Sequence, residues 1–355
     1  MILTTPMSVQ ETGQPGMSAL NKSYADPPLS PLMSNEVKDT IVFVLTQIFQ
    51  LILASFGIFS NIVNVIVYIK MGFSETSSIT LTALSLADLV TELWLLLMAA
   101  GLYENFDGYA YPTSIILVTL LSTAAFAMMG YGSWITAIIS AERCLCIVFP
   151  MKVKSIFTVR RISILLIVVF ILQMSSTIPT YATMKVTFVQ SPVTNRTSLA
   201  VTQTEHARYI ETISMFAAFT IPSVICFSIV VICTIFLVIK LNQSARWRQS
   251  AASATSKEDG SVSSKENKVA RSVVMICAIY IFCFAPNVFF FTTMAVYPNF
   301  AFGDPYLGHL QTTCLHIGFL GNAICSAVNI FVYIKMSTKY RETFFKLFSP
   351  CKKKA

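Results

Sequence analysis

Charged residues are scarce in this sequence: only 12% of its 355 residues are Asp, Glu, Lys or Arg, whereas 55% are hydrophobic. A soluble domain of this length has too little interior to bury that much apolar surface. Histidine is scarcer still. His206, His309 and His316 are the only three, and they are too scattered to supply the three or four ligands of a metal site. Without a nucleophile-and-base constellation either, we expect no catalytic residues, no metal and no cofactor.

Uncharged stretches, in contrast, are long and numerous. Each contains the roughly 20 apolar residues that a helix needs to cross a hydrocarbon core about 30 Å thick. None alternates with the period of two that is typical of barrel strands. The sequence therefore predicts an all-α membrane protein, a seven-transmembrane helix bundle. Six of the expected spans are uncharged: Ile41–Ile69, Gly108–Ala141, Ile162–Met184, Thr212–Ile239, Ser272–Gly303 and Pro305–Ile334. The seventh, Ser77–Tyr103, contains only Asp88 and Glu92 as charged residues.

Basic residues indicate the orientation of these spans. If the amino terminus is outside, 20 of the 25 Lys and Arg residues lie in or beside cytoplasmic segments, as the positive-inside rule requires. We therefore expect a multi-pass plasma-membrane protein with an extracellular amino terminus. The net charge of +8 then indicates topology and contact with membrane lipid, so nucleic acid is not an expected partner. The external basic residues are Lys22, Lys38, Lys185, Arg196 and Arg208.

Two sequons fall on the predicted outer side, at Asn21 and Asn195, and are expected glycosylation sites.

Among nine cysteines only Cys314 lies near the outer face, so no extracellular disulfide is expected. Cys351, followed by three lysines, is either an acylated second anchor or an unmodified tail thiol.

Three segments make up the expected domain organisation. Residues 1–40 are polar and rich in proline, and are predicted to be a disordered extracellular segment. Residues 41–336 form the seven-span domain. Residues 337–355 form a short amphipathic helix over Ser337–Phe348, lying on the inner leaflet, and a basic tail.

Two loops are long. The external loop Lys185–Glu211 is rich in Thr and Val, which permits a hairpin. The cytoplasmic loop Leu241–Arg271 is rich in serine and is expected to be flexible with helical ends. Two interpretations of the second loop remain open: it is phosphorylated, with a kinase and arrestin as partners, or it is a solvated linker.

Polar side chains within the spans are expected to face the bundle interior, because a charge at bilayer depth costs about 2.5–3.5 kcal/mol even on the most lenient scale. Such a set is either a hydrated network that differs between two packings of the bundle or plain interhelical hydrogen bonding. The predicted polar core comprises Asn61, Asp88, Ser326 and Asn329, with Asn64, Asn322 and Tyr333 beside it.

At the inner end of span three, Glu142 and Arg143 interrupt an uncharged helix. Arg143 needs a counter-ion, which Glu142 or Glu266 at the start of span six supplies. Such a pair holds the cytoplasmic ends of spans three and six together, unless Arg143 is an ordinary interfacial anchor. Prolines 179, 222 and 286 are expected to kink spans four, five and six. In span six, Phe284 lies two residues before Pro286, where a kink can act as a pivot.

Together these features resemble the rhodopsin-like class, class A, of G-protein-coupled receptors, from about Ile41 to Cys351. The resemblance is carried by Asn61, Leu84–Asp88, Glu142–Cys144, Pro150, Pro222, Cys283–Pro286 and Asn329–Tyr333, which are similar to the family's conserved motifs in order and spacing. It implies a receptor that binds an extracellular ligand and activates a heterotrimeric G protein. The activation switch would comprise Glu142, Arg143, Glu266, Phe284, Pro286, Asn329 and Tyr333.

Departures from the family pattern indicate a divergent branch that resembles invertebrate peptide-receptor-like and molluscan chemosensory receptors. Val118 stands where the family's external disulfide begins, Val230 replaces a Tyr of span five, and Ile330 replaces the usual Pro. Gly132 and Cys325 depart from the family's sodium site around Asp88.

The resemblance also narrows the ligand. Amine receptors carry an Asp where this chain has Ala125, and opsins carry a Lys where it has Ala323. A peptide or a small water-soluble cue is the remaining expectation. By resemblance the pocket is lined by Glu92, Phe126, Met129, Phe284, Asn287, Phe291, His316 and Phe319, although such side chains also serve as packing. The rival function is a seven-span transporter or membrane enzyme, but the sequence has no inverted repeat.

Overall fold

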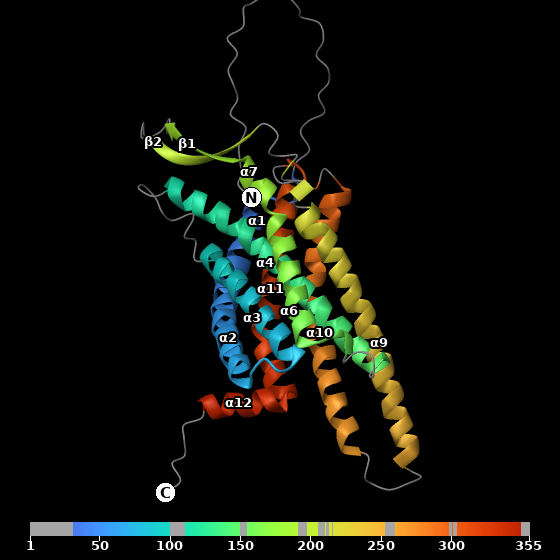
Figure 1. Ribbon diagram of the computed structural model, residues 1–355. Helices are drawn as coiled ribbons and strands as arrows, with labels where there is room; N and C mark the ends of the chain where they lie inside the picture. The colour runs from blue at the N-terminus through green and yellow to red at the C-terminus, as the bar shows by residue number, and fades with distance from the viewer. Residues whose placement is uncertain are drawn as a thin grey trace, which may run out of the picture.

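The computed structural model describes residues 31–99, 111–149, 155–190, 197–204, 210, 213–214, 216–252, 260–297, 300 and 304–348. Asn21, Asn195 and Cys351 lie outside these ranges. The described residues form a helical bundle with a small hairpin at one end and a transverse helix at the other (Figure 1). Seven of its helices are long and apolar enough to cross a membrane. The expected fold class is therefore confirmed.

The described ranges contain fourteen elements in chain order. Span one combines three of them, and spans four and five combine two each. The elements are α1 (Asn35–Phe43), η1 (Val44–Gln50), α2 (Leu51–Met71), α3 (Thr76–Ala99), α4 (Tyr111–Val148), α6 (Val159–Ser175), α7 (Ile178–Thr183), β1 (Met184–Gln190), β2 (Thr197–Gln203), η2 (Phe216–Thr220), α9 (Ile221–Ala252), α10 (Gly260–Val296), α11 (Gly308–Met336) and α12 (Thr338–Phe348).

Among the described side chains, many large apolar ones are exposed and several polar ones are buried, the reverse of the distribution in a soluble protein. Phe282 is 83% exposed and Phe289 71% exposed on the outside of α10, whereas Asn61 and Glu92 are fully buried. Large exposed apolar surfaces and buried polar groups are the two departures that need a physical explanation. Lipid around the bundle explains both, because it solvates the apolar side chains and forces the polar ones inward.

The first helix begins at Asn35, earlier than the predicted start at Ile41, because Ser34 caps it. The Ser34 hydroxyl accepts a hydrogen bond from the Val37 amide at 3.3 Å. Its first turn is polar, so a boundary drawn from hydropathy falls too late. In the loop predicted over Leu241–Arg271, α9 continues to Ala252 and α10 begins at Gly260.

Prolines or π-helical turns occur in four of the spans. Pro179 lies in the first turn of α7, directly after the break that ends α6, Pro222 follows the π-helix η2, and Pro286 lies inside α10. The π-helix η1 in span one contains no proline, and the sequence did not predict it. It places Thr46 and Gln50 inward: Thr46 Oγ1 lies 2.9 Å from His316 Nδ1, and Gln50 Nε2 donates to the Leu95 carbonyl at 3.0 Å.

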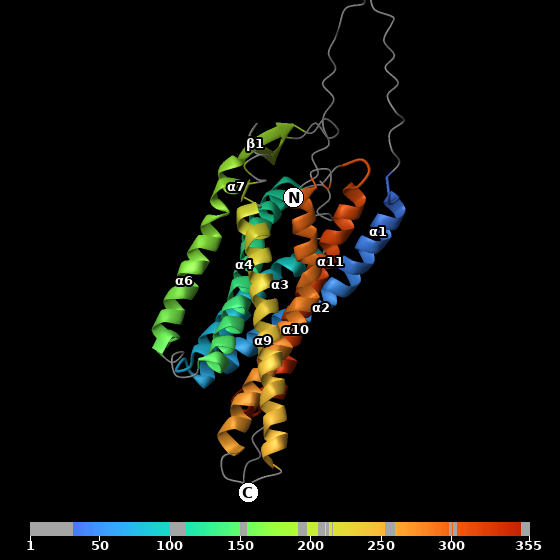
Figure 2. The same ribbon diagram turned by 90° about the vertical axis from the view of Figure 1, so that its right-hand side faces the viewer.

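The hairpin that the Thr and Val content permits is present. Strands β1 and β2 are antiparallel, with Met184 opposite Gln203 and Gln190 opposite Thr197. The hairpin lies beside α7 (Figure 1). Seen from the side, α4 runs through the middle of the bundle and α6 lies at its edge (Figure 2).

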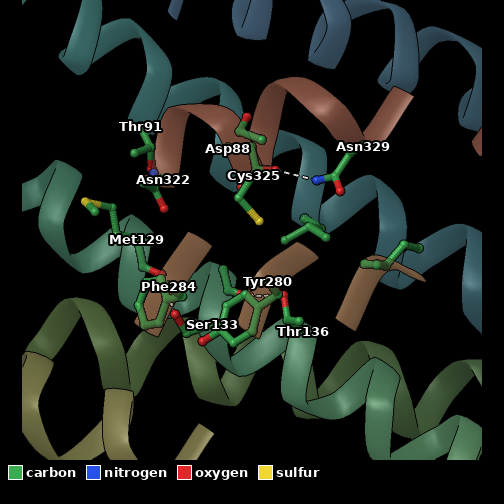
Figure 3. A pocket seen from close by; sticks show the side chains of 14 residues that line it. Asp88, Thr91, Met129, Ser133, Thr136, Tyr280, Phe284, Asn322, Cys325 and Asn329 are labelled. Carbon is green, nitrogen blue, oxygen red and sulfur yellow. Dashed lines mark hydrogen bonds between the residues drawn. The ribbon is translucent and has the colours of Figure 1, made fainter. Parts of the chain in front are cut away.

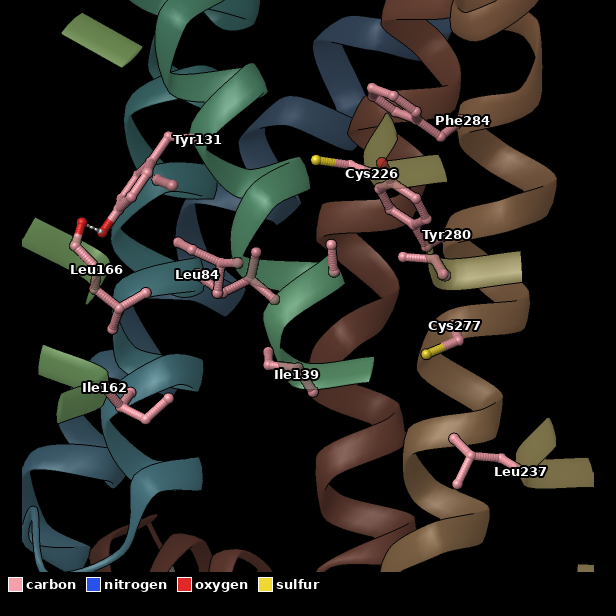
Figure 4. Close-up of a cluster of buried hydrophobic side chains, with 14 residues drawn as sticks. Leu84, Tyr131, Ile139, Ile162, Leu166, Cys226, Leu237, Cys277, Tyr280 and Phe284 are labelled. Atoms are coloured by element: carbon pink, nitrogen blue, oxygen red, sulfur yellow. Dashed lines mark hydrogen bonds between the residues drawn. The ribbon is translucent and has the colours of Figure 1, made fainter. Parts of the chain in front are cut away.

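A hydrophobic cluster joins α3, α4, α6, α9 and α10 in the half of the bundle nearer α12 (Figure 4). Its buried members include Leu84, Ile135, Leu166 and Tyr280. Tyr131 connects α4 to α6 because its hydroxyl donates to the Leu166 carbonyl at 3.3 Å. This cluster fixes the position of α4 among its neighbours.

Helix α12 crosses the end of the bundle opposite the hairpin (Figure 1). The sequence predicts an amphipathic helix here, with Tyr340 among its apolar residues. Tyr340 instead points into the bundle and is fully buried. Its ring packs against Tyr68 and Tyr333 at centroid distances of 5.2 and 5.6 Å. Its hydroxyl donates to Asn64 Oδ1 at 2.6 Å. Burial raises the pKa of Tyr340, so the phenol remains a donor at neutral pH.

Replacing Tyr340 by Phe should destabilise the protein by about 1–3 kcal/mol, because the buried Asn64 Oδ1 loses its donor while the packing of the ring is kept. Thermal unfolding of the full chain in detergent measures the effect. Tyr306→Phe is the matched control, because Tyr306 is partly exposed at the opposite end of the bundle. Equal melting temperatures for the two variants would contradict the prediction.

Candidate functional site

The structure brings the predicted polar core together from three helices. Asn61 of α2 donates through Nδ2 to Ser326 Oγ of α11 at 2.8 Å and to the Gly57 carbonyl at 3.0 Å. Asn329 of α11 donates through Nδ2 to Asp88 Oδ2 of α3 at 3.3 Å. Spans one, two and seven are thus linked by side-chain hydrogen bonds at membrane depth.

This polar network extends to the end of the bundle. Asn64 Nδ2 donates to Asn61 Oδ1 at 3.4 Å, and Asn64 Oδ1 accepts from Tyr340. The chain of contacts therefore runs from α12 through α2 to Ser326 on α11. The sequence places Asn64 beside the core correctly, but it gives no sign that Tyr340 joins it.

Asp88 lines a small internal cavity of about 30 Å³ between α3, α4, α10 and α11. Asp88 and Asn329 lie on one side, and Tyr280, Phe284 and Ser133 on the other (Figure 3). A cavity of this size has room for about two water molecules, since each needs about 10–15 Å³ by the same measure. Phe284, predicted to act beside the Pro286 kink, thus faces the same cavity as the polar core.

Around Pro286, α10 lies in close contact with the glycines of α11. A Cβ added at Gly321 would clash with the Cys283 carbonyl oxygen, and one at Gly318 would clash with the Asn287 amide. Asn287 is buried, and its Nδ2 donates to the Gly318 carbonyl at 3.0 Å. Proline removes one backbone hydrogen bond from α10, and the adjoining residues pack directly on the backbone of α11. Asn287, assigned by resemblance to the ligand pocket, engages α11 in this packing.

Toward the hairpin end lies an aromatic cluster, defined here as Trp94, Phe126, Phe219, Phe291 and Phe319. Phe126 is at its centre, with ring centroids 5.1 Å from Trp94 and from Phe219 and 5.7 Å from Phe319. Three of the predicted pocket residues therefore meet, and Met129 packs in the same buried cluster. His316 lies beside them, 5.9 Å from the Phe319 ring. The sequence analysis missed Trp94 and Phe219, because their only signal was an aromatic residue in an apolar span.

Glu92, the one acid assigned to the pocket, is fully buried at the α2 interface. A Cβ on Gly57 would lie only 2.8 Å from its Cδ, so the carboxyl lies against the backbone of α2. Within the described part of the chain, neither carboxyl oxygen has a hydrogen-bond partner.

Near the C-terminal end of α4, Arg143 pairs with Glu142, with Nη2 and Oε1 3.7 Å apart. Both side chains also reach the first turn of α3: Thr76 donates to Glu142 Oε1, and Arg143 donates to Ser77 Oγ. The Glu266 side chain lies outside the described residues, so the pairing of Arg143 with span six stays a prediction. Tyr333 is buried between Tyr68 and Tyr340.

The arrangement as a whole is that of a bundle with a closed aromatic cluster in one half, a polar network in the middle and an ion pair at the other end. A family model described as 7 transmembrane receptor (rhodopsin family) matches residues 60–333, which include Asp88, Pro286, the aromatic cluster and the ion pair. A search of curated proteins gives no match.

Gly321→Ala should destabilise the protein by about 1–3 kcal/mol, because the new methyl group clashes with the Cys283 carbonyl at the kink. Gly132→Ala is the matched control: its Cβ would meet its nearest neighbours at 3.8 Å, and alanine favours a helix by up to about 1 kcal/mol over glycine. Thermal unfolding in detergent compares the two. A Gly321→Ala protein as stable as Gly132→Ala would show that the helices are not in backbone contact there.

Proposed function

The chain belongs to the rhodopsin family of seven-transmembrane receptors, and on that premise we propose that it binds an extracellular ligand and activates a heterotrimeric G protein. The match over residues 60–333 is the observation that carries this proposal, because it spans the outer aromatic cluster and the inner ion pair. A receptor performs its work by a change in packing between these two regions.

The ion pair supports a resting packing. Arg143 is held by Glu142 and Ser77, and Glu142 in turn by Thr76, so two turns at the cytoplasmic ends of α3 and α4 are joined. Separation of these contacts frees Arg143 for a helix of the G protein. The same movement parts Arg143 from Glu266, if that pair forms in the resting protein.

The hinge links ligand binding to this end. Phe291, which follows Pro286 in α10, belongs to the aromatic cluster. Phe284, which precedes Pro286 in the same helix, is stacked on Tyr280 with ring centroids 4.9 Å apart. A ligand that separates the aromatic rings changes the packing of α10 above Pro286. Because Cys283 and Asn287 rest on the α11 glycines, α10 pivots there and its cytoplasmic half moves outward.

The proposed ligand is a peptide or a small water-soluble chemosensory cue that inserts into the aromatic cluster from the hairpin side. Its apolar part separates Phe126, Phe291 and Phe319, and His316 offers a polar contact beside them. Phe284, Met129 and Asn287 lie deeper along the same path. Glu92 is reached only if the α2 interface opens, since its carboxyl faces Gly57.

The proposed topology places the amino terminus and the hairpin outside the cell. Asn21 and Asn195 are then available for glycosylation, and Leu241–Arg271 for a kinase and arrestin. Residues 1–40 remain the proposed extracellular segment, 41–336 the receptor domain, and 337–355 the membrane-surface helix and tail, with Cys351 as the proposed acylation site.

Arg143→Ala should lower G-protein activation at least tenfold at equal surface expression, whereas Thr76→Val should raise ligand-independent activation. The valine removes a hydrogen bond to a charged group worth about 1.5–3 kcal/mol, enough to shift the resting equilibrium about tenfold. A G-protein dissociation sensor in cells, with peptide and odorant panels as stimuli, measures both.

Thr82→Val is the matched control for Thr76→Val, because Thr82 lies on the same helix and bonds only to the Ser78 carbonyl of its own helix. Undiminished coupling in Arg143→Ala, or basal activity of Thr76→Val no higher than that of Thr82→Val, would refute the role of the ion pair.

The topology predicts that Asn195 carries glycan on intact cells and that an epitope inserted between residues 253 and 259 is detected only after permeabilisation. Glycosidase treatment with the wild type and an Asn195→Gln variant measures the first, and antibody staining the second. Detection of both sites from the same side of the membrane would overturn the receptor proposal.

A further inference from the structure

Glu92 is an acid that the signalling path described above does not use. It lies one helical turn from Asp88 on α3 and is fully buried. It takes part in none of the ion pairs found in the described ranges. Both of its carboxyl oxygens are buried and lack a hydrogen-bond partner there. A strongly polar group in this position needs a physical explanation.

Among the described residues, the groups close to Glu92 on its own helix and on the helices beside it are either uncharged or acidic. From α2 comes Gly57, whose carbonyl already accepts from Asn61 and Ser60. From α3 comes Asp88, and from α11 come Cys325 and Ser326. The titratable groups near Glu92 in the described residues are therefore the Asp88 carboxyl and the Cys325 thiol, and neither is a cation.

An ionised carboxylate is poorly stabilised in such surroundings. Burial without a partner costs an ion far more than a neutral group, and a nearby Asp88 carboxylate would repel it. Asp88 itself is better placed for charge, because Asn329 donates to it and it borders the polar cavity. The two carboxyls thus have different environments, one polar and one dry.

We propose that Glu92 is a proton-binding site: its carboxyl holds a proton in this packing of the bundle, and release of that proton is coupled to the packing of α2, α3 and α11. The bound species is the hydrogen ion, and the site is formed by Glu92, the Gly57 backbone and Ser326.

Ser326 provides the coupling. Its hydroxyl oxygen accepts the hydrogen bond from Asn61 that joins α2 to α11, and it lies near both carboxyls. A negative charge on Glu92 attracts the Ser326 hydroxyl hydrogen and competes with Asp88 for it. Loss of the proton therefore disturbs the contact between spans one and seven, and the receptor responds to hydrogen-ion concentration as well as to its ligand.

Infrared spectroscopy of the purified full-length protein in lipid nanodiscs tests the site directly. The wild type at neutral pH should show the carbonyl-stretch band of a protonated carboxyl. Glu92→Gln should lose that band, whereas Asp88→Asn should keep it. A band that persists in Glu92→Gln, or that disappears in Asp88→Asn, would assign the proton elsewhere and overturn the proposal. If Glu92→Gln fails to fold, Asp88→Asn still tests the site, because loss of the band in that variant would assign the proton to Asp88.

The spectra are recorded in sodium chloride and in choline chloride at equal ionic strength. The protonated band should be the same in both salts. Its disappearance in sodium alone would show that the carboxyl is an ionised ligand of a metal ion under those conditions, and would also overturn the proposal.

Stability provides a second measurement. Unfolding exposes Glu92 to water, where it releases its proton at neutral pH, so unfolding becomes more favourable as the pH rises. The melting temperature of the wild type should fall as the pH is raised above neutral, and that of Glu92→Gln should fall less. Glu36→Gln, on the exposed part of α1, should behave as the wild type. Identical pH profiles for all three proteins would contradict a proton at Glu92. Neither measurement uses a ligand or a G protein, so its outcome is independent of the proposed signalling.

Discussion

The structure depends on one constraint: a polar side chain within a helix surrounded by lipid must find its partner inside the bundle. Asn61, Asn64 and Asn329 meet it through hydrogen bonds that cross from one helix to another. These bonds position α2, α3 and α11 relative to one another, which nonspecific apolar packing does not do. The same groups are polar enough to exchange partners, so the contacts that define one packing also make a second one accessible.

Backbone irregularities follow from the same constraint. The π-helix in span one turns Thr46 and Gln50 toward His316 and the Leu95 carbonyl, so that an irregular helix satisfies polar groups that a regular one would direct elsewhere. In α10, the backbone bond that Pro286 removes is offset by close packing on the α11 glycines. Irregular backbone is tolerated at membrane depth because neighbouring helices enclose it.

The sequence predicted what depends on composition and short spacing. It gave the seven spans, the inward-facing Asn61, Asp88, Ser326 and Asn329, and three members of the aromatic cluster. It did not predict features that depend on which face of one helix meets another. Tyr340 has an apolar position in an amphipathic pattern, yet its partner Asn64 is 276 residues away. Gly318 and Gly321 carry no side chain whose pattern would reveal a close approach, and Trp94 and Phe219 resemble any lipid-facing aromatic until the helices are packed.

In the described ranges, the hairpin end of the bundle is held by noncovalent contacts. All eight cysteines in the described ranges are free thiols. There the segment before α1 is bound to the start of α11: the Leu32 amide donates to the Tyr306 carbonyl at 3.0 Å, and His309 Nδ1 lies 2.8 Å from the Met33 carbonyl. At the opposite end, the Tyr340 ring of α12 packs against Tyr333 of α11, and its hydroxyl donates to Asn64 of α2. Helix α11 is thus held at both ends, whereas α10 contacts α11 through Cys283 and Asn287 beside Pro286 and contacts α4 through Cys277, whose Sγ lies 3.0 Å from Ser140 Oγ. The movement of α10 proposed above would therefore pivot on the glycines of a fixed α11 and would have to rearrange the apolar contacts that α10 makes with α4 and α9.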